Sequence, residues 1–187
     1  MNINLVTSNQ GKVEELTSIL EPFGHNASQL DISCPEIQAS TLEEVVDFGL
    51  EWLHNQGTKS PLVIDDAGVF VDELKGFPGV YSRYVYDTIS PKGLLKQMEG
   101  IENRAASFKC VLGLLLEDGG THKFVGECNG NIIHEIRGDG GFGYDPIFIP
   151  DGSDRTFAEL LPEEKNEISH RGRAMKNLLS FISEKGL

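Results

Sequence analysis

The pattern of hydrophobic and polar positions changes period along the chain, and each period predicts an element. Residues 2–7 carry the apolar side chains Ile3, Leu5 and Val6, which indicates a buried opening strand. Residues 12–23 repeat apolar side chains at helical spacing, and one helical face would carry Val13, Leu16, Ile19, Leu20 and Phe23. The chain is therefore predicted to open as a strand, a loop and a helix.

A second amphipathic helix is predicted over residues 41–53. Thr41 and Glu44 have the spacing of a capping box, in which each side chain bonds a backbone amide of the other residue. The apolar stripe is widened by Phe48 and Trp52 and is formed by Leu42, Val45, Val46, Gly49 and Leu53.

The middle of the chain has the shorter periods of strands. Residues 61–66 form a short apolar strand that ends in two carboxylates, and residues 69–74 are expected to form another strand after a bend at Ala67 and Gly68. A short helix is expected over residues 90–98. Two long strand-like stretches follow at residues 105–117 and 121–136, and the Asp118-Gly-Gly turn between them predicts an antiparallel hairpin.

A glycine-rich loop at residues 138–143 precedes a final helix predicted over residues 169–182. Helices alternate with strands of both parallel and hairpin type, which favours an α/β protein with a mixed sheet. The sequence contains no repeat, linker or low-complexity segment, so residues 1–187 are expected to form a single domain.

Composition and charge narrow the class of function. The formal net charge of -13 argues against a nucleic acid polymer as partner, because such binding depends on many lysines and arginines. A small anion is still compatible, since a few cations and a divalent metal suffice. Three cysteines without zinc-ligand spacing, no signal peptide and no apolar run near 18 residues predict a cytoplasmic protein with free thiols and no membrane partner.

A lysine near the start of the first helix is the first candidate for chemistry. Lys12 opposes the helix dipole, which indicates a negative group nearby. Backbone amides there could cradle a phosphate together with the side chains of Thr7, Ser8, Asn9 and Lys12. The alternative is that Asn9 is an ordinary N-cap and Lys12 a solvated lysine. A P-loop is excluded, because Val6 stands where its first glycine should be.

The start of the final helix has the same anomaly. Ser169 would cap a helix whose first residues are His170 and Arg171, and Lys165 lies one turn earlier. These cations could bind an anion or the edge of a base. The alternative is that they point into water.

Acidic residues supply candidate metal ligands. Asp65 and Asp66 end a strand where open α/β sheets place their ligands, and hard oxygen ligands suit magnesium. Neighbouring strand residues point to opposite faces, so only one of the two need face a cleft. Both can equally be structural aspartates at a strand end. Glu36 lies in an extended segment, where a solvated surface position is the simplest interpretation.

The glycine-rich loop matches GxGxxG literally, but Tyr144, Asp145 and Pro146 follow where a dinucleotide-binding turn requires a helix. A nucleobase site is more consistent with the residues present: Phe142 and Tyr144 could stack on a base, and Asp145 could accept base N–H groups. The competing interpretation is a loop that packs Phe142 into the core.

With these residues in view, the sequence resembles the Ham1 or ITPase family of non-standard purine nucleoside triphosphate pyrophosphatases, particularly its archaeal-type members. The resemblance covers nearly the whole chain. It is carried by residues 7–12 (TSNQGK), 35–38 (PEIQ), 65–68 (DDAG), 76–82 (GFPGVYS), 142–146 (FGYDP), 156–159 (TFAE), 164–165 (EK) and 169–171 (SHR).

The resemblance implies an elongated mixed sheet flanked by helices, with two lobes and a central active-site cleft, usually in a homodimer. It implies that magnesium is held by Glu36 and Asp66 and that Asp66 accepts the proton of the attacking water. The implied substrate-binding residues are Thr7, Ser8, Asn9, Gln10, Gly11, Lys12, Ala67, Phe142, Gly143, Tyr144, Asp145, Lys165, His170 and Arg171.

Two departures from the family pattern concern contact with the triphosphate. Ala67 stands where many members have serine, and residues 41–53 contain no lysine where many relatives carry one. The implied reaction is hydrolysis of ITP, dITP or XTP to the monophosphate and pyrophosphate. Two rival functions are a Maf-like pyrophosphatase with another base preference and a nucleotide sensor without turnover.

Overall fold

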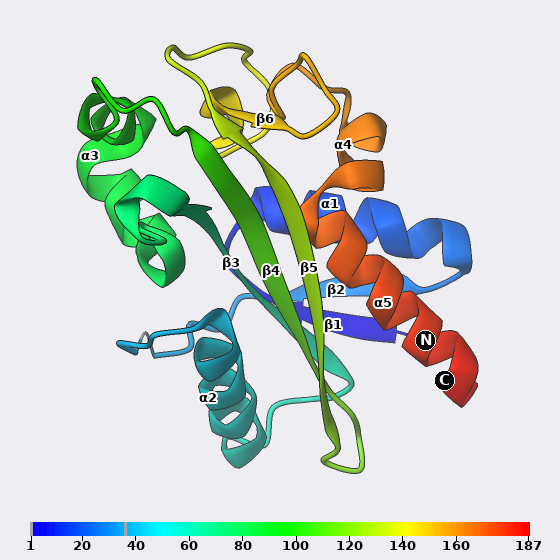
Figure 1. The fold of residues 1–187 in the computed structure, drawn as a ribbon. Helices are drawn as coiled ribbons and strands as arrows, with labels where there is room; N and C mark the ends of the chain where they lie inside the picture. Colours follow the sequence, from blue (N-terminus) through cyan, green and yellow to red (C-terminus); the bar gives the residue numbers. More distant parts are fainter. Residues whose placement is uncertain (1, 36) are drawn as a thin grey trace.

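A six-stranded mixed sheet organises the chain. The computed structural model describes residues 2–35 and 37–187. The strands lie in the order β2-β1-β3-β4-β5-β6; β1 is parallel to both β2 and β3, and the remaining pairs are antiparallel. Their bounds are β1 Asn2–Val6, β2 Asn26–Leu30, β3 Leu62–Val71, β4 Ala105–Leu115, β5 Thr121–Ile132 and β6 Phe148–Pro150. Figure 1 shows the long, twisted β4–β5 ribbon crossing the molecule.

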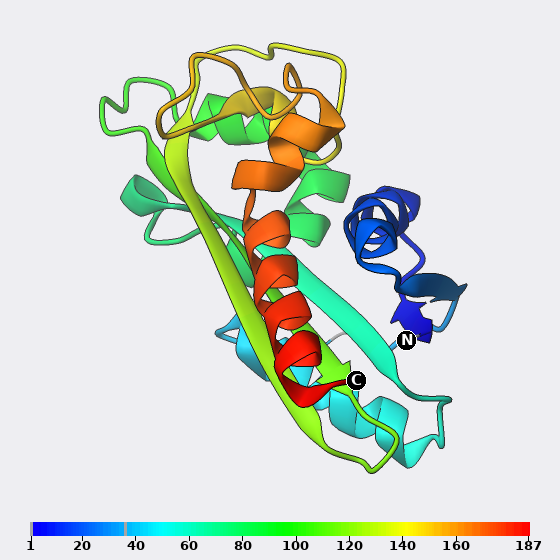
Figure 2. The ribbon, with the colours of Figure 1, turned by 90° about the vertical axis from the view of Figure 1, so that its right-hand side faces the viewer.

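Five α-helices flank the sheet. They are α1 Gln10–Leu20, α2 Leu42–Asn55, α3 Ser82–Gln97, α4 Pro162–Ile168 and α5 His170–Lys185. Helices α1 and α5 pack on one face and α2 on the other (Figure 2). Alternation along β3 explains the two layers: Val63 joins the core under α1 and α5, while Leu62 and Ile64 join the core under α2.

A third apolar cluster fills the end of the sheet near α3 and β6. Phe108, Phe148 and Phe157 form its centre, with ring centroids between 4.8 and 5.7 Å apart. The chain enters this region through the loop after β5 and leaves it through α4. The cluster therefore supports the loop and the helix start that carry the predicted base-binding residues.

Most of the predicted elements are confirmed. The chain opens as strand, loop and helix, Thr41 and Glu44 form the capping box of α2, and β4 and β5 form the predicted hairpin. The fold class, an α/β mixed sheet flanked by helices, is also as predicted. The prediction that Phe23 lies on the buried face of the first helix is wrong. Helix α1 ends at Leu20, and Phe23 lies in a following 3-10 turn with 64% of its surface exposed.

The structure corrects the bend expected after Asp66. Strand β3 continues without a break from Leu62 to Val71, and each of its residues pairs with β4. Gly68 keeps the strand straight where another segment crosses it, since a Cβ there would lie 2.2 Å from the carbonyl oxygen of Gly79. Asp65 and Asp66 therefore lie within β3. They are level with the end of β1, because Val6, its last residue, pairs with Ile64.

The predicted helix over residues 90–98 is the second half of α3. Ser90 has φ 59° and ψ 177°, so the helix kinks there, immediately before Pro91. The first half of α3, the polar strand β2 and the short helix α4 were not predicted. Each has weak periodicity: β2 has the sequence NASQL, in which apolar residues are too few to mark a strand.

Candidate active site

The first turn of α1 follows β1 in the chain and contacts the middle of β3 through Lys12. Asn9 is the N-cap, and its Oδ1 accepts a hydrogen bond from the Lys12 amide at 3.4 Å. Thr7 Oγ1 accepts from the Asn9 amide at 3.1 Å, and the side chains of Ser8 and Gln10 are exposed. Lys12 Nζ donates to the Asp65 carbonyl oxygen at 2.9 Å and forms an ion pair with Asp65 Oδ1. The negative group predicted beside Lys12 is thus an aspartate of the same chain.

The first turn of α5 is similarly capped but more deeply buried. Ser169 Oγ accepts from the Gly172 amide at 3.1 Å. The Arg171 side chain is only 3% exposed; its Nε donates to Asp65 Oδ2 at 2.8 Å, and its Nη1 donates to Glu15 Oε2. The alternative that these cations point into water is wrong for Arg171, and its availability to an anion or a base stays a prediction.

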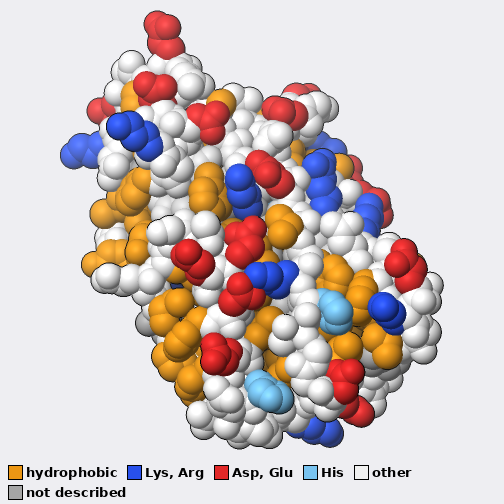
Figure 3. All heavy atoms as spheres, turned by 60° about the horizontal axis from the view of Figure 1, so that its bottom comes forward, with side chains coloured by type: hydrophobic (Ala, Val, Ile, Leu, Met, Phe, Trp, Pro, Cys, Tyr) orange, Lys and Arg blue, Asp and Glu red, His pale blue; other side chains and the backbone are white. Residues whose placement is uncertain are grey.

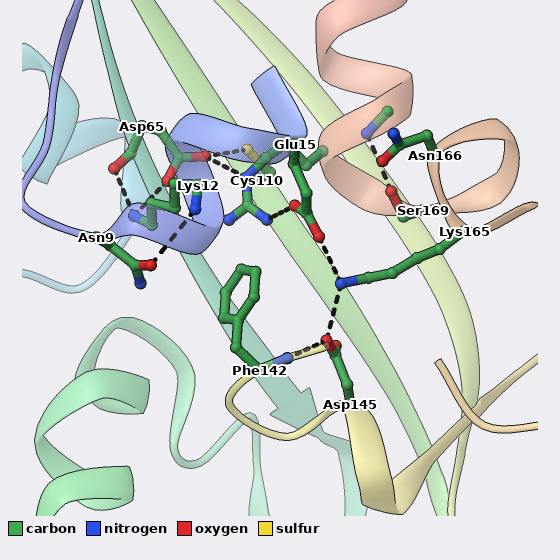
Figure 4. Close-up of polar contacts among 12 residues, drawn as sticks. Asn9, Lys12, Glu15, Asp65, Cys110, Phe142, Asp145, Lys165, Asn166 and Ser169 are labelled. Carbon is green, nitrogen blue, oxygen red and sulfur yellow. Dashed lines mark hydrogen bonds and ion pairs between the residues drawn. The ribbon is translucent and has the colours of Figure 1, made fainter. Parts of the chain in front are cut away.

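Lys165 in α4 completes a chain of ion pairs. Its Nζ lies 2.6 Å from Glu15 Oε1 and 2.8 Å from Asp145 Oδ2, and its side chain is 5% exposed. Figure 4 shows Glu15 and Lys165 pointing toward each other from α1 and α4, with Asp145 below. The ion pairs alternate along the path Lys12, Asp65, Arg171, Glu15, Lys165 and Asp145, which we call the buried charge network.

The network sets the ionisation of its two inner acids. Burial opposes the charge of Asp65, but the charges of Arg171 and Lys12 outweigh it and hold the pKa of Asp65 well below its ordinary value. Burial likewise opposes ionisation of Glu15, and Arg171 and Lys165 together lower its pKa. Both acids are therefore carboxylates at neutral pH, and each is shared between two cations.

The outer members behave differently. Burial raises the pKa of Asp145 despite its ion pair with Lys165. Burial, reinforced by the charges of Arg171 and Lys165, lowers the pKa of His170 well below its ordinary value. The His170 ring stacks on Phe108, with centroids 4.7 Å apart and planes 15° apart. His170 is therefore a neutral, buried imidazole, so the alternative that it points into water is wrong for this residue too.

The loop before β6 brings Phe142 to the network. Lys165 Nζ lies 4.8 Å from the centre of the Phe142 ring, and Arg171 Cζ lies 5.4 Å from it. Gly11 makes room for this ring, since a Cβ at residue 11 would approach Phe142 Cδ1 to 2.9 Å. Phe142 is half-buried, so the competing interpretation that it packs into the core is not supported.

Two neighbours in this loop differ from the expectation of an open base pocket. Tyr144 is 3% exposed, and its hydroxyl donates to the Ser82 carbonyl oxygen at 3.0 Å, so its ring is a core element with no free stacking face. Asp145 Oδ2 accepts from the Phe142 amide at 2.7 Å as well as from Lys165. Gly143 has φ 65°, a conformation that favours glycine.

Asp66 and Glu36, the predicted magnesium ligands, are placed less completely. Alternation along β3 turns Asp66 away from Asp65, toward the layer that contains Ile64 and α2. Ala67 lies beyond it on the Asp65 side, against the core under α1 and α5. Glu36 falls outside the described residues. The catalytic role of Asp66 and the metal roles of both acids therefore stay predictions.

Glu15 and Cys110 are members of this site that sequence reasoning missed. Glu15 follows Lys12 by three residues, so the two share a helical face, and this spacing was an available signal. Cys110 on β4 pairs with Ala67 in the neighbouring strand and donates its thiol to Asp65 Oδ2 at 3.1 Å. Only the sheet register reveals that contact.

The position of α5 is set by close backbone approach. A Cβ on Gly126 of β5 would lie 2.0 Å from the His170 carbonyl oxygen and 2.4 Å from the Ala174 amide nitrogen. Only a glycine at this point lets the first turn of α5 lie directly on the sheet. Arg171 is thus held in place by the sheet as well as by its ion pairs.

Two hollows of the described surface lie elsewhere. One, of about 700 Å³, is lined by residues such as Asn4, Lys59 and Leu187, and the other, of about 570 Å³, by residues such as Phe70, Lys109 and Asp151. None of the predicted site residues lines either. The central cleft therefore stays a prediction. On the face shown in Figure 3, basic side chains are interspersed with acidic ones.

The class of protein is given by comparison with known families. Residues 3–181 match the model of the Ham1 family, and the chain belongs to that family.

Particular relatives are similar over nearly their whole length. The chain is 54% identical over 184 residues to a protein of Thermococcus kodakarensis named dITP/XTP pyrophosphatase, with 98% of each chain covered, and 53% identical over 182 residues to one of the same name from Pyrococcus horikoshii, with 97% of each covered.

Solved structures agree. The Staphylococcus aureus Ham1 protein superposes with a TM-score of 0.84 at 30% identity, covering 99% of this chain and 100% of that one. A Mycobacterium abscessus structure titled nucleoside-triphosphatase / dITP/XTP pyrophosphatase gives a TM-score of 0.70 at 35% identity, covering 96% and 99%. Across the part of the chain that is described, no helix is long and apolar enough to cross a membrane.

Proposed function

We propose that the protein hydrolyses non-standard purine nucleoside triphosphates (ITP, dITP and XTP) to the monophosphate and pyrophosphate, and so removes them from the nucleotide pool. The observation that carries the proposal is the convergence of Lys12, Lys165 and Arg171 with Phe142 at one place. Three cations beside an aromatic ring suit a ligand with a phosphate end and a base end. The names of the archaeal relatives support the same reaction.

The substrate would lie across the two helix starts. Residues 7–12 would contact the polyphosphate, because the free backbone amides at the start of α1 attract anions. Lys165 would add a positive charge. Phe142, Gly143 and Asp145 would surround the purine together with His170 and Arg171. Tyr144 would support this loop from the core.

Charge balance supports a divalent metal. The buried charge network contains three cations and three carboxylates, so it has no net positive charge to offer a triphosphate. Outside residues 1 and 36, no three His, Cys, Asp or Glu side chains are grouped as a ready-made metal site. Magnesium is commonly held by one or two carboxylates together with substrate phosphates and water, so Asp66 and Glu36 are a sufficient protein share. When bound, magnesium would neutralise phosphate charge and acidify water.

The proposed reaction is in-line attack of water on the α-phosphorus, with pyrophosphate as leaving group. Asp66 would accept the proton of that water, which requires its carboxylate to lie within hydrogen-bond reach in the complex. The chain's other residues would hold the phosphates and base in line and keep other water out.

Base preference would follow from the donor character of Arg171. A guanidinium can only donate hydrogen bonds, so it pairs with the 6-oxo group of hypoxanthine or xanthine and not with the 6-amino group of adenine. Nε and Nη1 are already engaged, while no acceptor in residues 2–35 and 37–187 bonds to Nη2. That nitrogen would be the donor for the base, and ITP would be preferred to ATP.

The decisive experiment measures pyrophosphate release from a panel of triphosphates with and without magnesium. The expected result is magnesium-dependent release, fastest from ITP, dITP and XTP. Best turnover of a modified pyrimidine would favour the Maf-like function, and binding of ITP without release would favour the sensor.

Asp66→Asn tests the proposed base. This variant should lose roughly 10²- to 10⁴-fold in kcat with a much smaller change in KM, because general base catalysis contributes about that much. Asp87→Asn, which breaks an exposed ion pair with Arg83, is the matched control and should retain full activity. Near-normal turnover by Asp66→Asn would exclude Asp66 as the base.

Assembly and location are further parts of the proposal. The family resemblance supports a homodimer, and the negative charge with three free cysteines suits the cytoplasm. Sedimentation equilibrium would give the mass of the assembly, with a monomer as the contrary result.

A further inference from the structure

Asp65 is the point at which the two ends of the candidate site meet. Its Oδ1 pairs with Lys12 at the start of α1, and its Oδ2 accepts from Arg171 Nε at the start of α5 at 2.8 Å. Figure 4 shows Asp65 between the Lys12 and Cys110 side chains. The phosphate-end cation and the base-end cation are therefore held by one carboxylate, which is 1% exposed.

Both carboxylate oxygens of Asp65 are buried beside a cation: Oδ1 forms only the ion pair with Lys12, and Oδ2 accepts from Arg171 Nε. Oδ2 also accepts from the Cys110 thiol at 3.1 Å, and the Asp65 carbonyl oxygen accepts from Lys12 Nζ at 2.9 Å. A metal ligand needs an open oxygen, and a general base needs one that reaches water. Both oxygens of Asp65 are shielded from water by Lys12 and Arg171, a setting that suits neither role, although Asp65 precedes Asp66 directly in the sequence.

We propose that Asp65 is a positioning residue that couples base recognition to phosphate placement, because the same carboxylate fixes both Lys12 and Arg171. This inference rests on the proposed function. When the correct base engages Arg171, Asp65 is held in register, and Lys12 is thereby kept where the phosphates bind. When the base fits poorly, Arg171 and Asp65 shift together, and Lys12 loses its position.

The coupling can be measured without altering Arg171. The change at the base end is made in the substrate, by replacing ITP with ATP, and the change at the phosphate end is Lys12→Met. The quantity measured is the discrimination ratio, kcat/KM for ITP divided by kcat/KM for ATP. If Lys12 only contacts phosphate, Lys12→Met lowers both kcat/KM values equally, and the ratio is unchanged.

The proposal instead predicts that Lys12→Met lowers the discrimination ratio by roughly threefold or more, since residues in one network commonly couple by at least that factor. Lys176→Met is the matched control: Lys176 pairs with Glu167 on the exposed side of α5, and this variant should leave the ratio and the rate unchanged. An unchanged ratio in Lys12→Met would overturn the inference.

Asp65→Asn gives the second arm. It should lower the discrimination ratio by itself, and adding Lys12→Met to it should change the ratio no further, because the link is already broken. The magnesium concentration for half-maximal rate should stay within about twofold of the wild-type value. A several-fold rise in that concentration with an unchanged ratio would assign Asp65 to the metal and overturn the inference.

The possible failures are distinguishable. Should Asp65→Asn not fold, Lys12→Met alone still decides between equal and unequal loss. If the wild-type protein releases pyrophosphate from ITP but the ratio does not respond to Lys12→Met, the coupling fails and the proposed function stands. If no triphosphate is hydrolysed by the wild-type protein, the proposed function fails and the coupling fails with it.

Discussion

The starts of α1 and α5 have the same arrangement of a cap and a cation, but the cation of α5 is buried more deeply. Each has a cation in the first turn, where the helix dipole disfavours one, and each is capped by a side chain. Lys12 is 18% exposed and pairs with one carboxylate, Asp65. Arg171 is 3% exposed and is held by two, Asp65 and Glu15. A first-turn cation thus indicates a buried acid of the same chain before it indicates a ligand.

The largest difference between the two helix starts should appear in the free energy of unfolding when each cation is replaced by methionine. Arg171→Met should lower the free energy of unfolding by about 3–5 kcal/mol, because it leaves Glu15 and Asp65 buried with one cation fewer each. Lys12→Met should cost less, about 1–2 kcal/mol, since Asp65 keeps its bond to Arg171 and Lys12 itself is partly exposed. Urea unfolding at pH 7 measures both.

The exposed pair of Arg83 and Asp87 provides the baseline for these variants. Arg83→Met should change the free energy of unfolding by less than about 1 kcal/mol, as surface ion pairs do. Equal losses for Lys12→Met and Arg171→Met would show that depth makes no difference between the helix starts.

Between the two helix starts, only that of α5 should contribute a pH dependence near pH 6, because His170 has no counterpart in the first turn of α1. Burial and the charges of Arg171, Lys165 and Lys12 lower its pKa, while Asp65 favours the charged form only partly. The unfolded chain then binds a proton first as pH falls below about 6.5, so stability must decrease.

The free energy of unfolding should fall by at most about 1.4 kcal/mol for each pH unit below about 6.5. Above that pH, the His170 contribution should not change with pH. His170→Gln should reduce this pH dependence, leaving the share of His25, whose pKa is also lowered by burial, and His134→Gln, at an exposed position, should retain it. Unfolding measured between pH 5 and 7.5 checks this. The acids Asp65 and Glu15, whose pKa values are lowered, would add their own loss only below about pH 4.

The smallest difference in stability between the two helix starts should come from their N-cap residues, Ser169 and Asn9. Ser169→Ala and Asn9→Ala should each cost about 0.5–2 kcal/mol, with the larger loss for Ser169. Ser169 is 1% exposed, so water cannot replace its bond to the Gly172 amide, whereas Asn9 is half-exposed and its bond is longer. Thermal unfolding of both variants gives the order, and the reverse order would mean that burial does not strengthen the cap.

Local signals in the sequence were sufficient for the elements with strong periodicity or caps. The capping box at Thr41 and Glu44 and the Asp118-Gly-Gly turn each depend on neighbours a few residues apart. The kink at Ser90 also has a local signal, since Pro91 disfavours helical backbone at the residue before it, whereas the polar strand β2 depends on pairing with β1 and its sequence does not mark it. Local rules also could not separate Asp65 from Asp66, because only the layers above and below β3 distinguish them.

For the site, the residue types were predictable and their partners were not. Lys12, Lys165 and Arg171 were identified as unusual cations, and the structure brings them together with Phe142 and Asp145. The sequence did not predict that Glu15 and Asp65 would neutralise them, nor that Tyr144 and His170 would be buried. Those facts depend on contacts between residues up to 156 positions apart.

The glycine at residue 126 has a consequence for engineering. Because β5 touches the backbone of α5 there, the first turn of that helix is located by main chain against main chain, independently of the side chains at residues 170 and 171. A library at those two positions that seeks new base preferences must still supply a partner for Glu15 and Asp65, because both acids are buried against Arg171. Residue 126 itself should be left out of such a library, since any larger residue would force the first turn of α5 away from the sheet.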